Sequence, residues 1–311
     1  MKSQLLILLR DQDQIVSGEH ISRKLGISRV AVWKHIRKLN ELGYRIVSSA
    51  RGYRLHQSPD IPFPWEFPSR AANLHFFQET TSTMDEARRL ARGGCPHFSI
   101  VVAEQQIKGR GRLKRVWRSS AGGLYFTIVL RPNLSPAQSY RVNFLASIGL
   151  ARVLRQELAV EAGIKWPNDI FVNNKKIAGI LTELEAEADV VTFVNIGIGI
   201  NVNNDPSPKE PAATSLKQLL NRDVSRKKLL AAFLDQFENL MDQVTTFQVI
   251  PAWREMAITL NRPVRIETTQ DVFHGVAKDV DESGALILER PDGSTQRVIY
   301  GDCFHQTTED L

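Results

Sequence analysis

Residues 107–117 read IKGRGRLKRVW and combine two glycines with five cations. The cations are Lys108, Arg110, Arg112, Lys114 and Arg115. Arginine and lysine donate charge-assisted hydrogen bonds to anionic oxygens, and glycine lets the backbone approach a ligand closely. Three interpretations stay open from this stretch alone: an arm that binds nucleic acid, a loop that holds the phosphates of a small ligand, and a solvated turn. Because like charges repel, we expect the loop to be poorly ordered until an anion binds.

Two further segments carry polar side chains that packing does not require. In TTSTMDEARRL, Ser82 and Thr83 precede a helical pattern, and a plain helix cap is the simplest interpretation of their hydroxyls. In VTFVNIGIGINVN, Gly197 and Gly199 allow a ligand close to the backbone of a strand, and Asn201 offers an amide. A bare glycine alternation is also typical of a bulge.

The segment IKWPNDIFVNNKKIAGIL adds charged residues. Lys165, Asn168 and Asp169 lie beside a bend fixed by a proline, and Lys176 enters the strand that follows. An ordinary turn would explain WPND by itself.

The positive charge of the chain is concentrated near its beginning. Residues 1–58 contain 11 Lys and Arg against 4 Asp and Glu, whereas residues 59–311 contain 29 against 30. A basic excess confined to one short segment is typical of a nucleic-acid-binding module. The cations of residues 107–117 lie outside this module, so they need a separate explanation.

The first 58 residues predict three helices followed by two short strands. Ser28 is expected to cap the third helix, which Gly43 ends, and a turn with Gly26 separates it from the second helix. This is the helix-turn-helix pattern, and YRIVSSARGYRL predicts a wing. The predicted DNA-binding residues are Ser28, Arg29, Trp33, Lys34 and Arg37 of the third helix and Arg51 of the wing. A small helical protein-docking domain is the alternative.

Composition and breaks in the pattern divide the chain. Four prolines within residues 56–70 predict a domain boundary. Short alternating runs after about residue 260 predict a small β barrel. We therefore expect an α+β multidomain chain. Its parts are a winged helix-turn-helix domain (1–58), a linker (59–69), a central α/β domain with a mixed sheet (70–259) and a β barrel (260–311).

Several classes of protein are excluded by the same survey. No apolar run reaches the about 18 residues that a membrane helix needs, and residues 5–9 are too short for a secretion signal. We expect a cytoplasmic protein without a membrane partner. Cys95 and Cys303 lack partners at zinc-ligand spacing, so neither a zinc site nor a disulfide framework is predicted.

The motifs SRVAVWKHIRKL, TSTMDEA, AEQQIKGRGR, KWPND, KIAGIL and GIGINVN occur in one order along nearly the whole chain. In this order they closely resemble the biotin protein ligase family, specifically its bifunctional bacterial members, the biotin operon repressors. The resemblance implies a class II synthetase-like catalytic domain and an SH3-like barrel. It also implies that biotin and ATP form biotinoyl-5'-AMP, which acylates a lysine of the biotin carboxyl carrier protein of acetyl-CoA carboxylase. As an adenylate-bound homodimer, such a protein represses biotin biosynthesis genes by binding operator DNA.

The resemblance also implies roles for particular residues. The implied catalytic residues are Lys176, Arg112 and Asp169, with Asp169, helped by Asn168, as the ligand of Mg²⁺. The implied contacts of biotin and nucleotide are Ser82, Thr83, Gln106, Gly109, Arg110, Arg112, Arg115, Trp117, Lys176, Gly197, Gly199 and Asn201. Ser82, Thr83 and Gln106 suit the neutral ureido ring of biotin, whereas the cations suit phosphates and the biotin carboxylate. The cations of residues 107–117 are then expected to meet an adenylate rather than DNA.

This sequence departs from the usual family pattern at two places. Met84 stands where asparagine is common, so one polar contact with biotin is in question. Leu113 and Lys114 stand where a further Arg-Gly is common, which makes the loop stiffer by one glycine.

Two alternative functions stay open. Lipoate protein ligases share the catalytic fold and adenylate chemistry, but lipoate lacks a ureido ring for Ser82, Thr83 and Gln106 to bind. A non-catalytic biotin-sensing transcriptional repressor would bind the ligand without transferring it, and the presence of Lys176 and Asp169 argues against that alternative.

Overall fold

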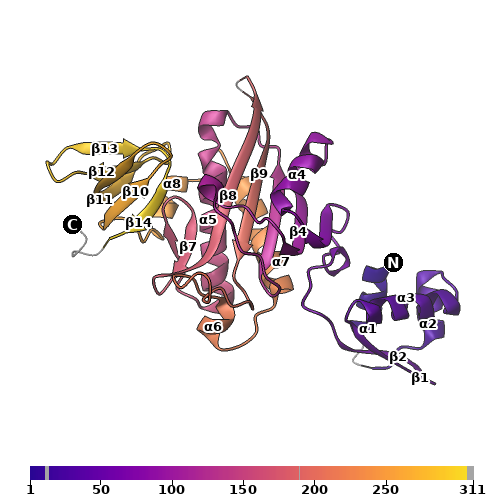
Figure 1. Cartoon of the computed structure of the whole chain (residues 1–311). Coiled ribbons are helices and arrows are strands. Elements are labelled where there is room, and N and C mark those ends of the chain that lie inside the picture. Colours follow the sequence, from indigo (N-terminus) through magenta and orange to yellow (C-terminus); the bar gives the residue numbers. More distant parts are fainter. Residues whose placement is uncertain (11–13, 189, 307–311) are drawn as a thin grey trace. The chain divides into compact units, whose positions relative to one another are not determined.

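The computed structural model describes residues 1–10, 14–188 and 190–306, except the side chain of Lys114, and divides into two compact units. The N-terminal unit is Met1–Ala72 and the second unit is Asn73–Leu311. Figure 1 shows both units and labels many of their elements. Residues 11–13 of the expected first domain and 307–311 of the expected barrel lie outside the described residues.

The N-terminal unit has the expected three helices and hairpin. Its elements are α1 (Lys2–Arg10), α2 (Gly18–Leu25), α3 (Arg29–Glu41), β1 (Arg45–Ser49) and β2 (Gly52–Gln57). The Ser28 hydroxyl accepts a hydrogen bond from Ala31 N at 3.2 Å and so caps α3. Gly26 ends α2 at a φ of 65°, a conformation that glycine adopts without strain. Val32, Ile36 and Leu39 of α3 are buried, which leaves the opposite face of this helix outward.

The proline-rich segment is packed onto this unit. It contains the short helix η1 (Pro64–Glu66), and Phe63 and Phe67 on either side are buried. The Glu66 carboxylate accepts hydrogen bonds from Arg10 Nη2 at 2.9 and 3.0 Å and another from the Tyr44 hydroxyl. These contacts explain why the compact unit continues to Ala72.

The second unit is built on a mixed seven-stranded sheet of order β3-β4-β5-β9-β8-β7-β6. The strands are β3 (Leu74–Thr80), β4 (Ser99–Gln106), β5 (Leu124–Leu130), β6 (Gly163–Lys165), β7 (Asp169–Val172), β8 (Lys175–Glu187) and β9 (Val190–Ile200). Strand β3 is parallel to β4, and the other neighbours are antiparallel. Every residue of β5 is buried, as its unbroken apolar sequence LYFTIVL predicts for a strand covered on both faces.

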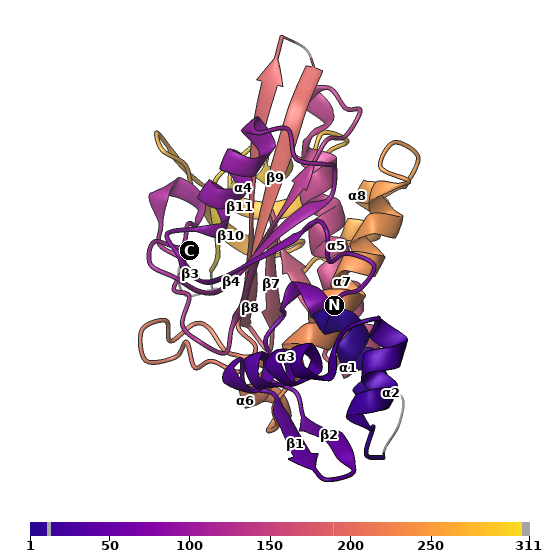
Figure 2. The ribbon, with the colours of Figure 1, turned by 90° about the vertical axis from the view of Figure 1, so that its right-hand side faces the viewer.

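Helices cover both faces of this sheet, as Figure 2 shows. On one face, Ala87 and Ala91 of α4 (Thr83–Arg92) pack with Val101, Val129 and Phe193. The other face carries α5 (Tyr140–Leu158) and α7 (Arg226–Met241). The ring of Phe126 on that face lies 5.5 Å from the ring of Phe233 in α7. Because residues two apart on a strand share a face, Gly197 and Gly199 lie on the α4 face with Phe193.

The C-terminal part of this unit is an antiparallel five-stranded sheet of order β13-β12-β11-β10-β14. The strands are β10 (Pro263–Glu267), β11 (Val272–Val280), β12 (Leu286–Glu289), β13 (Thr295–Val298) and β14 (Asp302–His305). We call it the β domain. Trp166 Nε1 donates a hydrogen bond to Gly284 O at 3.1 Å, so the β domain is anchored to the segment that precedes β7. The expected fold class, with a helix-turn-helix, a mixed sheet and a β-rich end, is confirmed.

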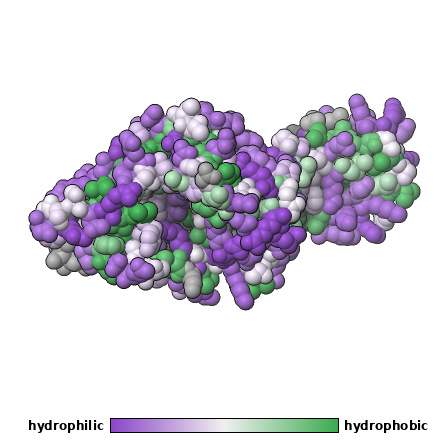
Figure 3. Space-filling model, turned by 90° about the horizontal axis from the view of Figure 1, so that it is seen from above, coloured by the Kyte–Doolittle hydropathy of each residue, from purple (hydrophilic) through white to green (hydrophobic). Residues whose placement is uncertain are grey.

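Short helices complete the fold. They are η2 (Arg112–Lys114), η3 (Pro136–Gln138), α6 (Leu216–Leu220) and α8 (Val249–Arg254). Within the described ranges, every helix is too short or too polar to cross a membrane. On the face shown in Figure 3, hydrophilic residues are interspersed with apolar ones, so apolar side chains gather there only in small groups.

Candidate functional site

A cavity of about 700 Å³ lies on the α4 face of the sheet. Its walls come from the start of α4, the loop of residues 107–118, strands β8 and β9, residues 165–171 and strand β14. The expected ligand-site residues that line it are Ser82, Thr83, Gln106, Arg110, Arg112, Arg115, Trp117, Asp169, Lys176, Gly197, Gly199 and Asn201. Residues separated by more than a hundred positions in the sequence thus meet at one cavity.

Hydrogen bonds fix the polar side chains at the start of α4. Gln106 Oε1 accepts from Thr83 N at 2.8 Å and from the Thr83 hydroxyl at 3.1 Å, and Gln106 Nε2 donates to Ser119 Oγ at 2.7 Å. The buried Thr127 hydroxyl donates to the Thr83 hydroxyl at 2.9 Å. Ser82 caps α4 and accepts from Met84 N at 3.3 Å, so the simple helix-cap interpretation is correct for its oxygen. Its hydroxyl hydrogen can still point to a ligand, because a hydroxyl donates as well as accepts.

Side chains from other segments pack directly on Gly197 and Gly199, the two glycines of β9. A Cβ on Gly197 would lie 2.5 Å from Met84 Sδ, and a Cβ on Gly199 would collide with Trp117 Nε1. Gly179 on β8 also lies under the Trp117 ring, 2.9 Å from its Cζ3 when given a Cβ. The close approach that glycine alternation predicts is therefore made by Met84 and Trp117. These two side chains cover the part of the sheet that forms the cavity wall.

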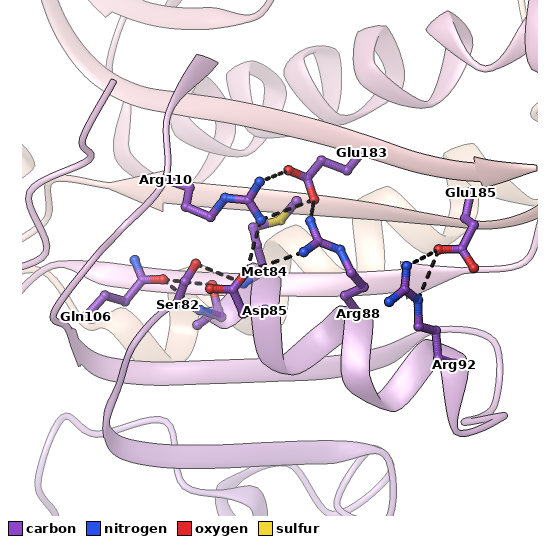
Figure 4. Close-up of polar contacts among 10 residues, drawn as sticks. Ser82, Met84, Asp85, Arg88, Arg92, Gln106, Arg110, Glu183 and Glu185 are labelled. Carbon is purple, nitrogen blue, oxygen red and sulfur yellow. Dashed lines mark hydrogen bonds and ion pairs between the residues drawn. The ribbon is translucent and has the colours of Figure 1, made fainter. Parts of the chain in front are cut away.

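Arg110 joins the cationic loop to α4 and β8. Its guanidinium donates to Asp85 Oδ1 at 3.0 Å and pairs with Glu183. Arg88, one turn along α4, pairs with the same Glu183 (Figure 4). The side chain of Arg110 lines the cavity but its charge is directed to these two carboxylates.

Arg112 and Arg115 join the same loop to the β domain. Arg112 donates to Gly301 O at 2.6 Å and to the amide oxygen of Asn168 at 3.4 Å. Arg115 pairs with Asp302 at 2.9 Å. Burial lowers the pKa of Arg112 from its ordinary value, and the nearby carboxylates of Asp302 and Asp169 oppose that shift. A buried cation whose charged form is disfavoured in this way would be stabilised by an anionic ligand.

Lys176 and Asp169 form an ion pair in the cavity wall. Lys176 Nζ lies 2.6 Å from Asp169 Oδ2 and 5.5 Å from the centre of the Trp117 ring. The Asn168 amide donates to Ile180 O at 2.6 Å, and its oxygen accepts from Arg112, so Asn168 is engaged in holding neighbouring segments. Of the two residues expected to bind the metal, Asp169 is therefore the one that lines the cavity.

Several cavity residues had no role in the sequence analysis. Lys165 lines the cavity with its Nζ 4.8 Å from the Phe171 ring centre, and burial lowers its pKa. Phe304 and His305 of β14 line it too, and burial lowers the pKa of His305 to about 4. The sequence places Lys165 among the charged residues beside the proline bend but does not indicate a role for it. The β14 residues carry no local signal, because only the fold brings the end of the chain to the cavity.

Gly109 and Asn201, two of the expected site residues, make contacts that stabilise the fold around the cavity. Gly109 lies beside the cavity, where a Cβ would collide with Trp117 O and lie 3.2 Å from Gln106 Nε2. Asn201 is buried, and its Oδ1 accepts from Asn204 Nδ2 at 3.0 Å. Gly109 thus allows the loop to fold over Gln106, and Asn201 contributes to a turn at the cavity wall.

The expected DNA-binding residues lie on one side of the N-terminal unit. On α3, Arg29, Trp33, Lys34 and Arg37 are all exposed, and Arg51 is exposed in the turn between β1 and β2. Arg29, Trp33 and Arg51 line one groove of about 460 Å³. Arg37 lies 5.1 Å above the Trp33 ring. Cations on an exposed helix and on a wing turn suit a double-stranded nucleic acid.

Comparisons with known proteins match three parts of the chain to known families. Residues 2–54 match a family model described as HTH domain, residues 76–203 match the Biotin/lipoate A/B protein ligase family, and residues 259–306 match the Biotin protein ligase C terminal domain. The Bifunctional ligase/repressor BirA of Bacillus subtilis (strain 168) is 36% identical over 296 residues, which cover 90% of this chain and 91% of that protein. The protein of the same name from Escherichia coli (strain K12) is 28% identical over 319 residues, covering 98% and 97%.

A solved structure shows the same fold for the second unit. The biotin protein ligase from Aquifex aeolicus in complex with biotin and ATP matches with a TM-score of 0.65 and 25% identity, over 76% of this chain and 99% of that one. The resemblance found in the sequence is confirmed by these matches. The chain belongs to the Biotin/lipoate A/B protein ligase family, and it is similar to a bifunctional ligase/repressor over 90% of its length.

Proposed function

We propose that this chain is an ATP-dependent biotin protein ligase that also acts as a repressor. A carboxylate oxygen of biotin attacks the α-phosphorus of ATP, the bond from that phosphorus to the bridging oxygen breaks, and pyrophosphate leaves. The amine of a lysine in the biotin carboxyl carrier protein then attacks the acyl carbon of biotinoyl-5'-AMP, and AMP leaves. Because the adenylate already has a good leaving group, no covalent bond to the enzyme is needed.

One observation carries this proposal: a single cavity joins a neutral hydrogen-bonding end to a cationic end. Ser82, Thr83 and Gln106 provide fixed partners for a ureido ring, and such partners discriminate strongly against ligands that lack the matching groups. Lys176 and Arg112 provide the positive charge that two reacting anions need when they approach. The distance between these sets is spanned by Met84 and Trp117 along β9, where the biotin chain and the nucleotide would lie.

Asp169 is the proposed ligand of Mg²⁺. Magnesium in nucleotide sites keeps several waters and phosphate oxygens and is bound by one or two protein carboxylates. A single carboxylate at the cavity wall fits that requirement, and its pairing with Lys176 keeps it next to the proposed phosphate position. When bound, the ion would neutralise charge on the phosphates, while Lys176 would hold the biotin carboxylate.

The repressor activity is proposed for the N-terminal unit. Its first 58 residues carry a net charge of +7, and the α3 and wing cations face outward. We propose that an adenylate-bound homodimer binds operator DNA with two related half-sites. Its affinity should fall steeply with salt concentration, because phosphate contacts release counterions.

Exchange of labelled pyrophosphate into ATP tests the ligase step. We expect exchange that requires biotin and is not supported by lipoate. Exchange supported by lipoate alone would replace this proposal with a lipoate ligase. Binding of biotin without any exchange would leave a non-catalytic sensor. Adding a carrier domain should then label one lysine of that domain with biotin.

A further inference from the structure

Gly197 is a glycine because of one neighbour. It lies in β9, paired with Thr127 of β5 and Leu181 of β8, and its φ is outside the left-handed region, so its backbone conformation suits any residue. A Cβ there would lie 2.5 Å from Met84 Sδ and 3.0 Å from Met84 Cγ, whereas the next neighbour, Thr127 Oγ1, would be 3.5 Å away. Met84 alone therefore forbids a side chain at residue 197.

Met84 lies at the polar end of the cavity, next to the side chains that are proposed to bind the ureido ring. It is 3% exposed and lines the cavity beside Ser82, Thr83 and Gln106. Figure 4 shows its sulfur beside the ion pairs of Arg110. An unbranched thioether fills irregular space and packs well against rings.

The space above Gly199, the next glycine along β9, is also occupied by a side chain. Gly199 lies on the same side of the strand and receives the Trp117 indole, which the cationic loop supplies. The wall between the polar end and Lys176 is therefore made by two side chains that rest on two glycines. The free space at the polar end depends on how deeply Met84 rests on Gly197.

We infer that Met84 and Gly197 form a matched pair that sets the size of the cavity at its polar end and so determines which ring this enzyme accepts. This inference rests on the proposed biotin ligase function. The fused bicyclic ring of biotin packs against the Met84 thioether while Ser82, Thr83 and Gln106 bind its ureido group. Met84 is then a residue that determines specificity through apolar contact, in place of a polar contact with biotin.

Three variants of the full chain test the pair in biotin-dependent pyrophosphate exchange. Gly197→Ala pushes the thioether into the cavity and should raise the KM for biotin about tenfold or more, the usual effect of a methyl-sized misfit in an apolar pocket. Met84→Ala removes the contact and should also raise it about tenfold. In the double variant the new Cβ occupies space that the thioether has left. Its KM should be within about threefold of the Met84→Ala value, because the two substitutions are coupled.

The KM for ATP and thermal melting separate this role from a purely structural one. The KM for ATP should stay at the wild-type value in all three variants. Leu90→Ala is the matched control, because Leu90 is on the same helix and packs against the core cluster that contains Ala87 and Val101, without lining the cavity. It should lower the melting temperature and leave the KM for biotin unchanged.

Each other outcome overturns the inference. An unchanged KM for biotin in Met84→Ala does so even if Gly197→Ala fails to fold. A double variant whose KM for biotin rises by the product of the two single effects, about 100-fold, does so too, because the two substitutions would then act independently. Failure of the proposed function is distinguishable, because the wild type would then show no exchange that depends on biotin.

Discussion

Lys176 is the residue on which the proposed chemistry depends most. Its ammonium is held by Asp169 at 2.6 Å, and its side chain is 30% exposed within the cavity wall. We expect Lys176→Ala to slow adenylate formation by about 100-fold or more, since loss of a charge that stabilises a transition state costs a few kcal/mol. Single-turnover adenylate formation measures this effect. Lys175→Ala is the control, because Lys175 is its exposed neighbour in β8. A near wild-type rate in Lys176→Ala would remove Lys176 from the mechanism.

His305 predicts a pH dependence of stability. Burial, helped by the charges of Lys165 and Arg262, lowers its pKa from 6.5 to about 4. Between these values the unfolded chain binds a proton that the folded chain does not, so the free energy of unfolding falls as the pH drops from about 6.5 to 4. We expect His305→Gln to reduce this dependence. Urea unfolding at several pH values in this range measures it, and the same slope in both proteins would show that His305 does not contribute.

At this scale, the sequence identified side chains that line the cavity and that carry a signal within their own segment. Ser82 and Thr83 at a helix start and Lys176 in a strand are of this kind. The sequence did not predict the ion pair between Arg110 and Glu183. These residues are 73 positions apart, and only the pairing of β8 with the rest of the sheet brings them together. Nor did it predict that Met84, rather than a ligand, lies against Gly197.

The cationic loop is the element in which expectation and structure differ most. Repulsion predicts disorder, yet each described arginine in residues 110–115 has an acceptor: Arg110 has Asp85 and Glu183, Arg112 has a backbone carbonyl, and Arg115 has Asp302. Leu113 takes a left-handed conformation with a φ of 48°, which is costly for a leucine. Opposite charges from three distant segments thus offset local repulsion. Local sequence cannot show contacts of this kind.

These contacts predict how the loop responds to ligand. Phosphates of a bound ligand should compete with Asp302 for Arg115. In the unliganded protein Asp302 helps to hold the loop through this ion pair, so Asp302→Asn should speed trypsin cleavage within residues 108–118. The Arg115 side chain is 55% exposed and that of Asp302 is 14% exposed. A partly exposed ion pair of this kind is worth about 1 kcal/mol, so the increase should be about two- to fivefold. Biotin plus ATP should protect the loop in both proteins. Asp271→Asn, an exposed carboxylate of the same β domain, serves as the control. Equal cleavage of Asp302→Asn and wild type would mean that the pair does not order the loop.

At the scale of the whole molecule, the limits of the units lead to a further prediction. The proline-rich segment adds buried Phe63 and Phe67 and the ion pair of Glu66 with Arg10 to the N-terminal unit. A fragment of residues 1–72 should therefore have a free energy of unfolding about 3 kcal/mol higher than residues 1–58, since burying one phenylalanine contributes about 1.5–3 kcal/mol. Urea denaturation of both fragments measures the difference. Equal stabilities would mean that this segment does not stabilise the unit.

The overall organisation was accessible from the sequence for a physical reason. Helix caps, glycine stops and alternating patterns act within a few residues, and each of them agrees with the fold in this chain. The proline cluster was interpreted as a linker because proline does not fit regular elements. The segment nevertheless contacts α1, where Lys2 Nζ lies 3.8 Å from the centre of the Trp65 ring, and only tertiary structure reveals such a contact.

The most direct test of the proposed function is the identity of the ligand that the protein retains after incubation with biotin and ATP. The full chain is separated from free ligand, and the bound species is released and measured by mass spectrometry, before and after addition of the carrier domain. The proposed function predicts biotinoyl-5'-AMP in the first sample, and in the second its loss together with a carrier domain that has gained one biotin. Unreacted biotin in the first sample and an unmodified carrier in the second would contradict it.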